Sequence, residues 1–161
     1  MRRAASCSAS SISFSAARKI TICYNIGMKR YSPGIFETLA ESLPAYAKAA
    51  DGSWTGFCVL TLGIGVNSAR FQSKFPGQAL PKTWEDLLNP AFKGEIVMTD
   101  PVASSTAYLF LQCQLQRLGW DAGWDYLLRL SQNVGQFPDS GSAPPKLVGT
   151  GEYAIGIAYL H

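Results

Sequence analysis

Three adjacent hydroxyl side chains, Ser104, Ser105 and Thr106, stand between an apolar segment and a predicted helix. The first turn of a helix leaves backbone N–H groups unpaired and carries a partial positive charge, so hydroxyl groups there suit a carboxylate, a phosphate or an oxyanion. The same side chains also serve as helix N-caps, which need no ligand. These residues therefore predict either an anion site or ordinary capping.

A second loop of the same kind, Ser140-Gly141-Ser142, precedes a short helix predicted over 143–148. Two such loops in one small α/β unit favour a shared pocket. An ordinary flexible connection is the alternative, because Gly and Ser gather in any loop.

The end of the chain carries Tyr153, Tyr159 and His161. Phenol and imidazole groups near the end of a strand are able to bind a hard metal such as ferric iron. Packed aromatic rings are the alternative for the two tyrosines, and the identity of any metal stays open.

Catalytic groups are scarce. The only histidine is His161, which leaves no Ser-His-Asp or Cys-His arrangement within the chain. The four cysteines have no C-x-x-C pair and no zinc-ligand spacing, and Cys58 and Cys113 lie in apolar runs where they pack as small hydrophobic residues. We therefore expect no enzyme and no cofactor.

Charge argues against a nucleic-acid partner. The net charge is +3, but residues 1–31 carry six basic side chains and no acid, whereas residues 32–161 carry 8 basic and 11 acidic side chains. The basic residues of the body are scattered singly, and no patch is available to meet phosphates. With 161 residues and 47% apolar residues, the chain has enough material for one folded core.

Strand and helix patterns alternate along the body, which predicts an α/β fold with a mainly parallel sheet flanked by helices. Ligands of such sheets usually bind at the carboxyl ends of the strands. The apolar set of the helix at 120–130 is Trp124, Leu127, Leu128 and Leu130, and we expect Trp84, Trp120 and Trp124 in the core. Helices are predicted at 35–50, 83–88, up to Gly119, 120–130 and 143–148, and strands at 54–66, 95–99 and 152–159.

The order and spacing of several segments resemble the periplasmic solute-binding proteins of ABC importers, in the group that includes ferric-iron and phosphonate binders. The similarity runs from about residue 35 to His161. The segments that carry it are 51–57, 65–67, 80–90 with its Pro-Lys-Thr-Trp block, 92–98, Asp100-Pro101, 104–106 and 151–157.

This resemblance implies a clamshell built of three-layer α/β lobes, with the rest of the clamshell incomplete or absent. Residues 32–66 would then form the end of the first lobe and a crossing strand, and residues 67–161 the ligand-binding second lobe. Residues 1–31 form a basic, Ser/Ala-rich leader or a non-native start, expected to be poorly ordered, without the uninterrupted apolar segment of a secretory signal.

The resemblance also implies a function: capture of a small anion, ferric iron or a phosphonate-like solute, outside the cytoplasm or in the periplasm, for an ABC permease. Ser104-Ser105-Thr106 stands where the family usually has serine-glycine-threonine, and Ser140-Gly141-Ser142 is similar to a second pocket-lining segment. Asn67 and Tyr159 are further candidates near the hinge and the cleft.

The alternative is a truncated or non-transport α/β lobe that acts as a regulatory or interaction module without a ligand. In either case the apolar stretch from Trp54 to Leu62 would be left uncovered by a missing lobe. An exposed apolar face of that kind favours self-association.

Overall fold

A computed structural model describes residues 12–20, 44–45, 48, 50 and 60–160. The chain divides into two compact units, one of residues 1–17 and 62–160 and the other of residues 18–61 and 161. Most of the sheet and all the described α-helices belong to the first unit. Most of the helix predicted at 35–50 and much of the strand predicted at 54–66 lie outside the described residues.

Five strands form one sheet in the order β1-β2-β5-β3-β4. Strand β3 pairs in parallel with both β4 and β5, which confirms the predicted parallel character. The Asn67 N–H at the end of β2 donates to the Ala154 carbonyl just before β5, at 2.9 Å, so β2 runs opposite to β5. The strands are β1 (Ile12–Ile20), β2 (Leu60–Asn67), β3 (Ile96–Val97), β4 (Val134–Gln136) and β5 (Ile155–Leu160).

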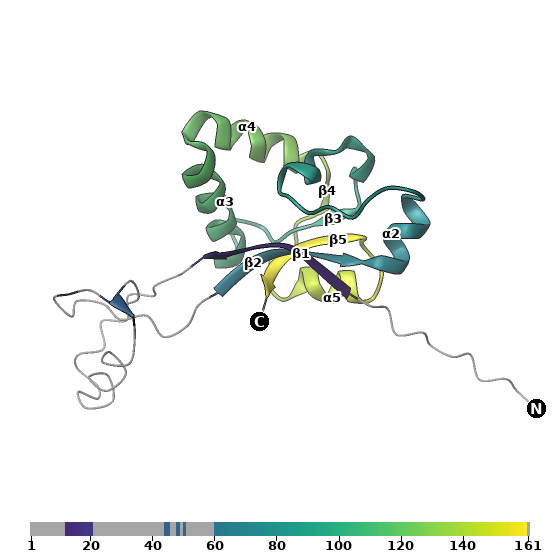
Figure 1. Ribbon diagram of the computed structural model, residues 1–161, viewed down its shortest axis with the longest axis horizontal. Helices are drawn as coiled ribbons and strands as arrows, with labels where there is room; N and C mark the ends of the chain where they lie inside the picture. Colours follow the sequence, from purple (N-terminus) through teal and green to yellow (C-terminus); the bar gives the residue numbers. More distant parts are fainter. Residues whose placement is uncertain (1–11, 21–43, 46–47, 49, 51–59, 161) are drawn as a thin grey trace, which may run out of the picture. The chain divides into compact units, whose positions relative to one another are not determined.

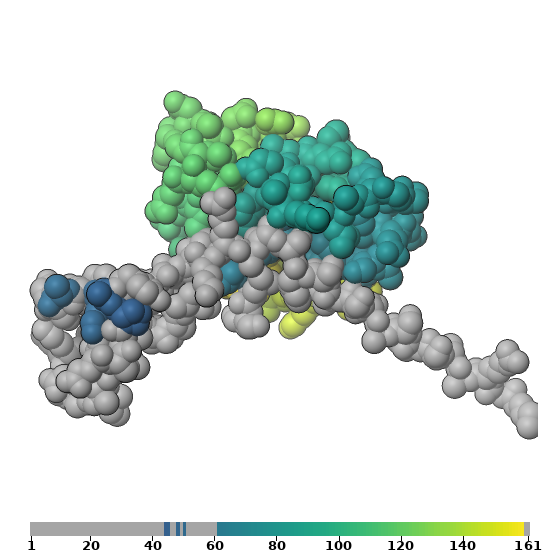
Figure 2. Space-filling model, viewed as in Figure 1, coloured from purple at the N-terminus to yellow at the C-terminus, as the bar shows by residue number. Residues whose placement is uncertain are grey.

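Helices cover both faces of this sheet. The chain moves from β3 outward to β4 and then back across β3 to β5, and right-handed connections in opposite directions place their helices on opposite faces. Figure 1 shows α3 and α4 on one side and α5 on the other, and Figure 2 shows α3 and α4 (green) forming an outer surface of this unit. The helices are α2 (Ser68–Lys74), α3 (Ser105–Leu118), α4 (Trp120–Ser131) and α5 (Ala143–Gly149).

Local signals set the helix ends. Ser104 is the N-cap of α3, and Gly119, with φ of +85°, separates α3 from α4, so both predicted helices are confirmed. The helix predicted at 83–88 is a 3-10 turn, η2 (Glu85–Leu88), and a second one, η3 (Pro90–Phe92), follows it. The Asp86 carboxylate accepts the backbone N–H groups of Lys82 and Thr83, which lower its pKa.

The core differs from the prediction on α4. Trp84 is buried as expected, but Trp120 is 69% exposed, so its predicted core position is wrong, and Leu128 of the apolar set is 63% exposed. Tyr126 is buried instead. Its hydroxyl donates to the carbonyl of Trp84, the residue before η2, at 2.7 Å. The fully buried side chains of the sheet include Leu62, Ile64, Val66, Ile96, Val97 and Ile155.

Two short elements carry no clear pattern in the sequence. Helix α2 has seven residues and only Phe71 is buried, so no helical period develops. Strand β4 has three residues, none of them buried. In contrast, the strand predicted at 95–99 exists but is paired only over β3.

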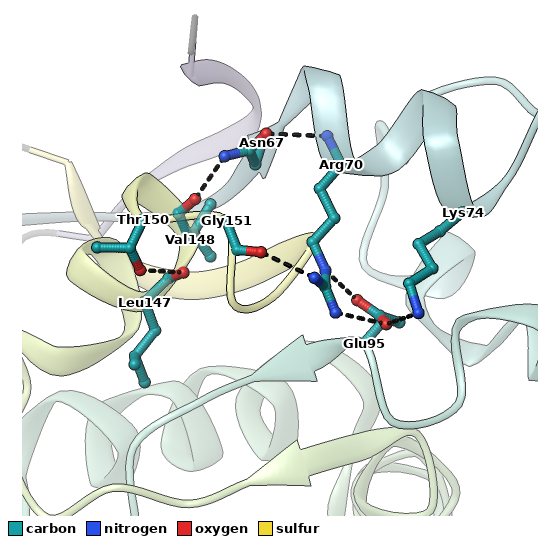
Figure 3. Close-up of polar contacts among 8 residues, drawn as sticks. All are labelled: Asn67, Arg70, Lys74, Glu95, Leu147, Val148, Thr150 and Gly151. Atoms are coloured by element: carbon teal, nitrogen blue, oxygen red, sulfur yellow. Dashed lines mark hydrogen bonds and ion pairs between the residues drawn. The ribbon is translucent and has the colours of Figure 1, made fainter. Parts of the chain in front are cut away.

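A cluster of polar contacts joins α2 to the amino-terminal edge of the parallel strands (Figure 3). The Arg70 guanidinium donates to both carboxylate oxygens of Glu95, at 2.7 and 2.8 Å, and to the Gly151 carbonyl at 2.8 Å. Lys74 adds a second cation 3.1 Å from Glu95. Three segments distant in sequence are thereby held together: α2, the start of β3 and the turn between α5 and β5.

Asn67 extends this cluster (Figure 3). Its side-chain oxygen accepts the Arg70 backbone N–H at 3.0 Å and so caps α2, while its amide donates to the Val148 carbonyl at 2.8 Å. With its own backbone bond to Ala154, the buried Asn67 residue uses N–H, side-chain acceptor and side-chain donor at once.

We expect Glu95→Gln to lower the free energy of unfolding by about 2 kcal/mol, because two cations lose their shared carboxylate. Burial acts to raise the pKa of Glu95, but hydrogen bonds from Arg70 and Lys74 outweigh it and hold the pKa below its usual value. A lowered folded-state pKa contributes stability that is present above the unfolded-state value, about 4.3, and is lost as pH falls through the folded-state value.

Urea unfolding between about pH 7 and pH 3 measures both effects. Glu95→Gln should lose less stability on acidification than the unchanged chain. The matched control is Asp125→Asn, since Asp125 and Arg129 form an exposed pair at 3.6 Å that should contribute less than about 1 kcal/mol. Parallel acid-induced losses in the unchanged chain and in Glu95→Gln would contradict this role.

Candidate functional site

The loops that follow β3 and β4 lie side by side at the carboxyl edge of the sheet. The Asp100 N–H after β3 donates to the Pro138 carbonyl after β4, at 3.0 Å. A Cβ atom placed on Gly141 would lie 2.5 Å from Thr106 Oγ1 and 3.3 Å from Ser104 Oγ. The structure therefore brings together the two hydroxyl loops, and only glycine allows this approach.

The first loop presents donors at the start of a 14-residue helix. The Ser104 hydroxyl accepts the Thr106 N–H at 3.3 Å, which is a long capping bond. Within the described part of the chain, no partner is found for the N–H groups of Ser105 and Ala107. Thr106 is buried against Gly141, whereas Ser105 is exposed. Capping is thus present, and it leaves backbone donors available to an anion.

The second loop places its hydroxyls further toward solvent. Ser140 Oγ and Ser142 Oγ are 3.1 Å apart and both residues are exposed. The Ala143 N–H donates to the Ser140 carbonyl at 2.9 Å and closes the turn before α5. The side chain of Ser142 makes no capping bond to α5. Both hydroxyls are therefore accessible beside the approach of Gly141 to Thr106.

Thr99 is a polar residue at this edge that the sequence pattern did not single out. It follows Met98 and is 1% exposed, and its hydroxyl has no hydrogen-bond partner among the described residues. A buried hydroxyl normally has a hydrogen-bond partner, so we expect a water molecule or a ligand to supply one here. The available signal was a single threonine closing the apolar run Ile96-Val97-Met98.

The other two predicted site residues, Asn67 and Tyr159, lie at opposite edges of the sheet. Asn67 is at the opposite edge of the sheet from the hydroxyl loops, because it pairs with Ala154 at the start of β5. Tyr159 lies near the carboxyl end of β5, the same edge as the loops. Asn67 therefore belongs to the anchor of α2, and Tyr159 is compatible with a position at the margin of the site.

Among residues 12–20, 44–45, 48, 50 and 60–160, no group of three or more His, Cys, Asp or Glu side chains is placed to hold a metal ion. Within the same part of the chain, no helix has the length and apolar character needed to cross a membrane. His161 lies outside the described residues.

Comparison with known proteins adds sequence and structural relatives. The periplasmic binding protein P5PA is 40% identical, with a TM-score of 0.59 over 63% of this chain and 32% of its own. The periplasmic binding protein AfuA from Actinobacillus pleuropneumoniae, solved with fructose-6-phosphate bound, is 37% identical, with a TM-score of 0.60 over 62% of this chain and 31% of its own. The phosphoglycerate transport regulatory protein PgtC of Salmonella typhimurium is 39% identical over 54 residues, 34% of this chain and 14% of its own.

Ferric-binding proteins are similar in fold alone. The protein from Campylobacter jejuni is 20% identical, with a TM-score of 0.62 over 76% of this chain and 37% of its own. This chain spans about a third of the length of P5PA and AfuA. The family described as bacterial extracellular solute-binding protein matches residues 26–161. Since that match covers most of the sequence, the chain belongs to this family of extracytoplasmic binding proteins of ABC transporters, with a partial periplasmic-binding-protein lobe as its fold.

Proposed function

We propose that this chain captures an organic phosphate ester outside the cytoplasm, in the periplasm, for import by an ABC permease. The phosphate group would be held where the loops after β3 and β4 meet. The observation that carries the proposal is the approach of Gly141 to Thr106, at the start of a helix whose first turn has N–H groups to spare. Phosphate oxygens accept hydrogen bonds from such donors.

The donors at this edge suit an oxyanion. Ser105 and Thr106 contribute hydroxyls from α3, Ser105 and Ala107 contribute backbone N–H groups, and Ser140 and Ser142 contribute exposed hydroxyls from the facing loop. The unsatisfied hydroxyl of Thr99 lies at the base of the first loop. Tyr159 would stand at the margin of this site, at the end of β5.

The relatives favour a phosphate ester over iron. AfuA, with fructose-6-phosphate bound, and PgtC, named for phosphoglycerate transport, are 37% and 39% identical over the matched regions. The similarity to the ferric-binding protein of Campylobacter jejuni, at 20% identity, concerns the fold alone. Hydroxyl and amide donors are also a poor ligand set for a metal ion, which requires acceptors.

We expect fructose 6-phosphate to stabilise the 161-residue chain against urea, by about 2.7 kcal/mol at 100 times its dissociation constant. Inorganic phosphate should stabilise it less, and fructose not at all, because the phosphate group makes the proposed contacts. Stabilisation by ferric citrate instead would contradict the ester. A cooperative transition that no solute moves would support the alternative, a lobe without a ligand.

Thr106→Val should weaken fructose 6-phosphate binding roughly tenfold, because it removes one hydroxyl donor while keeping the shape of the side chain. Isothermal titration calorimetry measures the loss. The matched control is Thr150→Val, which removes a hydroxyl at the other end of α5, where Thr150 donates to the Leu147 carbonyl (Figure 3). Equal losses in the two variants would argue against a role for Thr106.

Gly141→Ala tests the approach of the two loops. The added methyl group would overlap Thr106 Oγ1, so either the Thr106 side chain or the loops must shift, and we expect a loss of about 1–3 kcal/mol in stability together with weaker solute binding. Ser140→Ala is the control, since it removes only an exposed hydroxyl from the same loop. Unchanged stability and affinity in Gly141→Ala would rule out a close contact between these loops.

A further inference from the structure

A cavity lies in the helical layer that covers one face of the sheet. It has a volume of about 400 Å³ and opens to solvent between α3, α4 and the first residues after β3 and β4. Its walls come from Leu111 on α3, Trp124 and Leu128 on α4, and Phe137 after β4. The hydroxyl loops take no part in its lining. Cavities of this size that are mostly apolar and hold few polar groups are typical of small-molecule sites.

The polar groups of this cavity are Asp100 and Ser131. The Ser131 hydroxyl already donates to the Leu128 carbonyl at 2.7 Å. One carboxylate oxygen of Asp100 accepts the Val102 N–H at 2.7 Å, and no described residue donates to the other. No ion pair joins Asp100 to a basic side chain in the described part of the chain. Arg129, the basic residue of α4, pairs with Asp125 instead.

A carboxylate without a counter-charge at the edge of an apolar cavity favours a cationic ligand. The aromatic walls point the same way, because Trp and Phe rings attract ammonium groups and pack against flat apolar bodies. Leu128 and Phe137 are 63% and 41% exposed, which leaves the mouth of the cavity open.

We propose that this cavity binds a small aromatic ammonium ion, with the ammonium group on Asp100 and the ring between Trp124 and Phe137. The site is separate from the proposed phosphate site and does not depend on it. Asp100 nevertheless belongs to the loop that leads to Ser104, since its carbonyl accepts the Ser104 N–H at 3.0 Å.

The test uses 2-phenylethylammonium chloride as the probe, added to the ¹⁵N-labelled 161-residue chain. We expect saturable shifts of the Trp124 indole N–H resonance, which the Trp124→Phe variant identifies by its loss. The neutral analogue 2-phenylethanol has a similar shape but lacks the charge, so its affinity should be lower by roughly tenfold or more.

Asp100→Asn should weaken the ammonium probe by a similar factor, because the amide oxygen keeps the bond from the Val102 N–H while the charge is lost. Asp139→Asn is the matched control, an exposed acid on the neighbouring loop that does not line the cavity, and it should leave the affinity unchanged.

Three results would overturn the proposal: no saturable shift at Trp124, equal affinity for the alcohol, or equal losses in Asp100→Asn and Asp139→Asn. Titration with fructose 6-phosphate separates this proposal from the previous one. If fructose 6-phosphate does not bind but the ammonium probe does, the result counts against the proposed function and leaves the ammonium site standing.

Discussion

The bidentate pair between Arg70 and Glu95 connects the part of the chain that precedes the parallel strands to the strands themselves. Arg70 also holds the Gly151 carbonyl, and Asn67 joins the end of β2 to both α5 and β5. These contacts gather at one edge of the sheet and position α2, β3 and the α5–β5 turn. Because the same strands end at the opposite edge, the placement of their carboxyl ends depends on this anchor.

At the carboxyl edge of the sheet, the strand order brings together two loops that are distant in sequence. Strands β3 and β4 are parallel neighbours, so the loops that follow them leave the sheet together. Their approach needs a residue without a side chain at Gly141, where any Cβ would meet the Thr106 hydroxyl. The proposed site is lined by hydroxyl and backbone N–H donors, which suit an oxyanion.

Helix α4 exposes large apolar side chains on its outer surface. The sequence predicts Trp120 in the core and Leu128 in the apolar set of α4, yet both are exposed. Tyr126 occupies the interior instead, where its hydroxyl donates to the Trp84 carbonyl. Leu128 instead lines a cavity beside Asp100, whereas hydrophobic periodicity by itself indicates only ordinary packing.

The sequence by itself determined the α/β class, the boundary at Gly119 between α3 and α4, a hydroxyl cap within residues 104–106 and the family resemblance, because caps, glycines and hydrophobic periods act over a few residues. It left out α2 and β4, which are too short to show a period. Tertiary structure alone decided that Gly141 meets Thr106, that Asn67 lies at the opposite edge, and that Thr99 is buried without a partner in the described chain. Those relations join residues far apart in sequence, and strand order and direction set the distances between them.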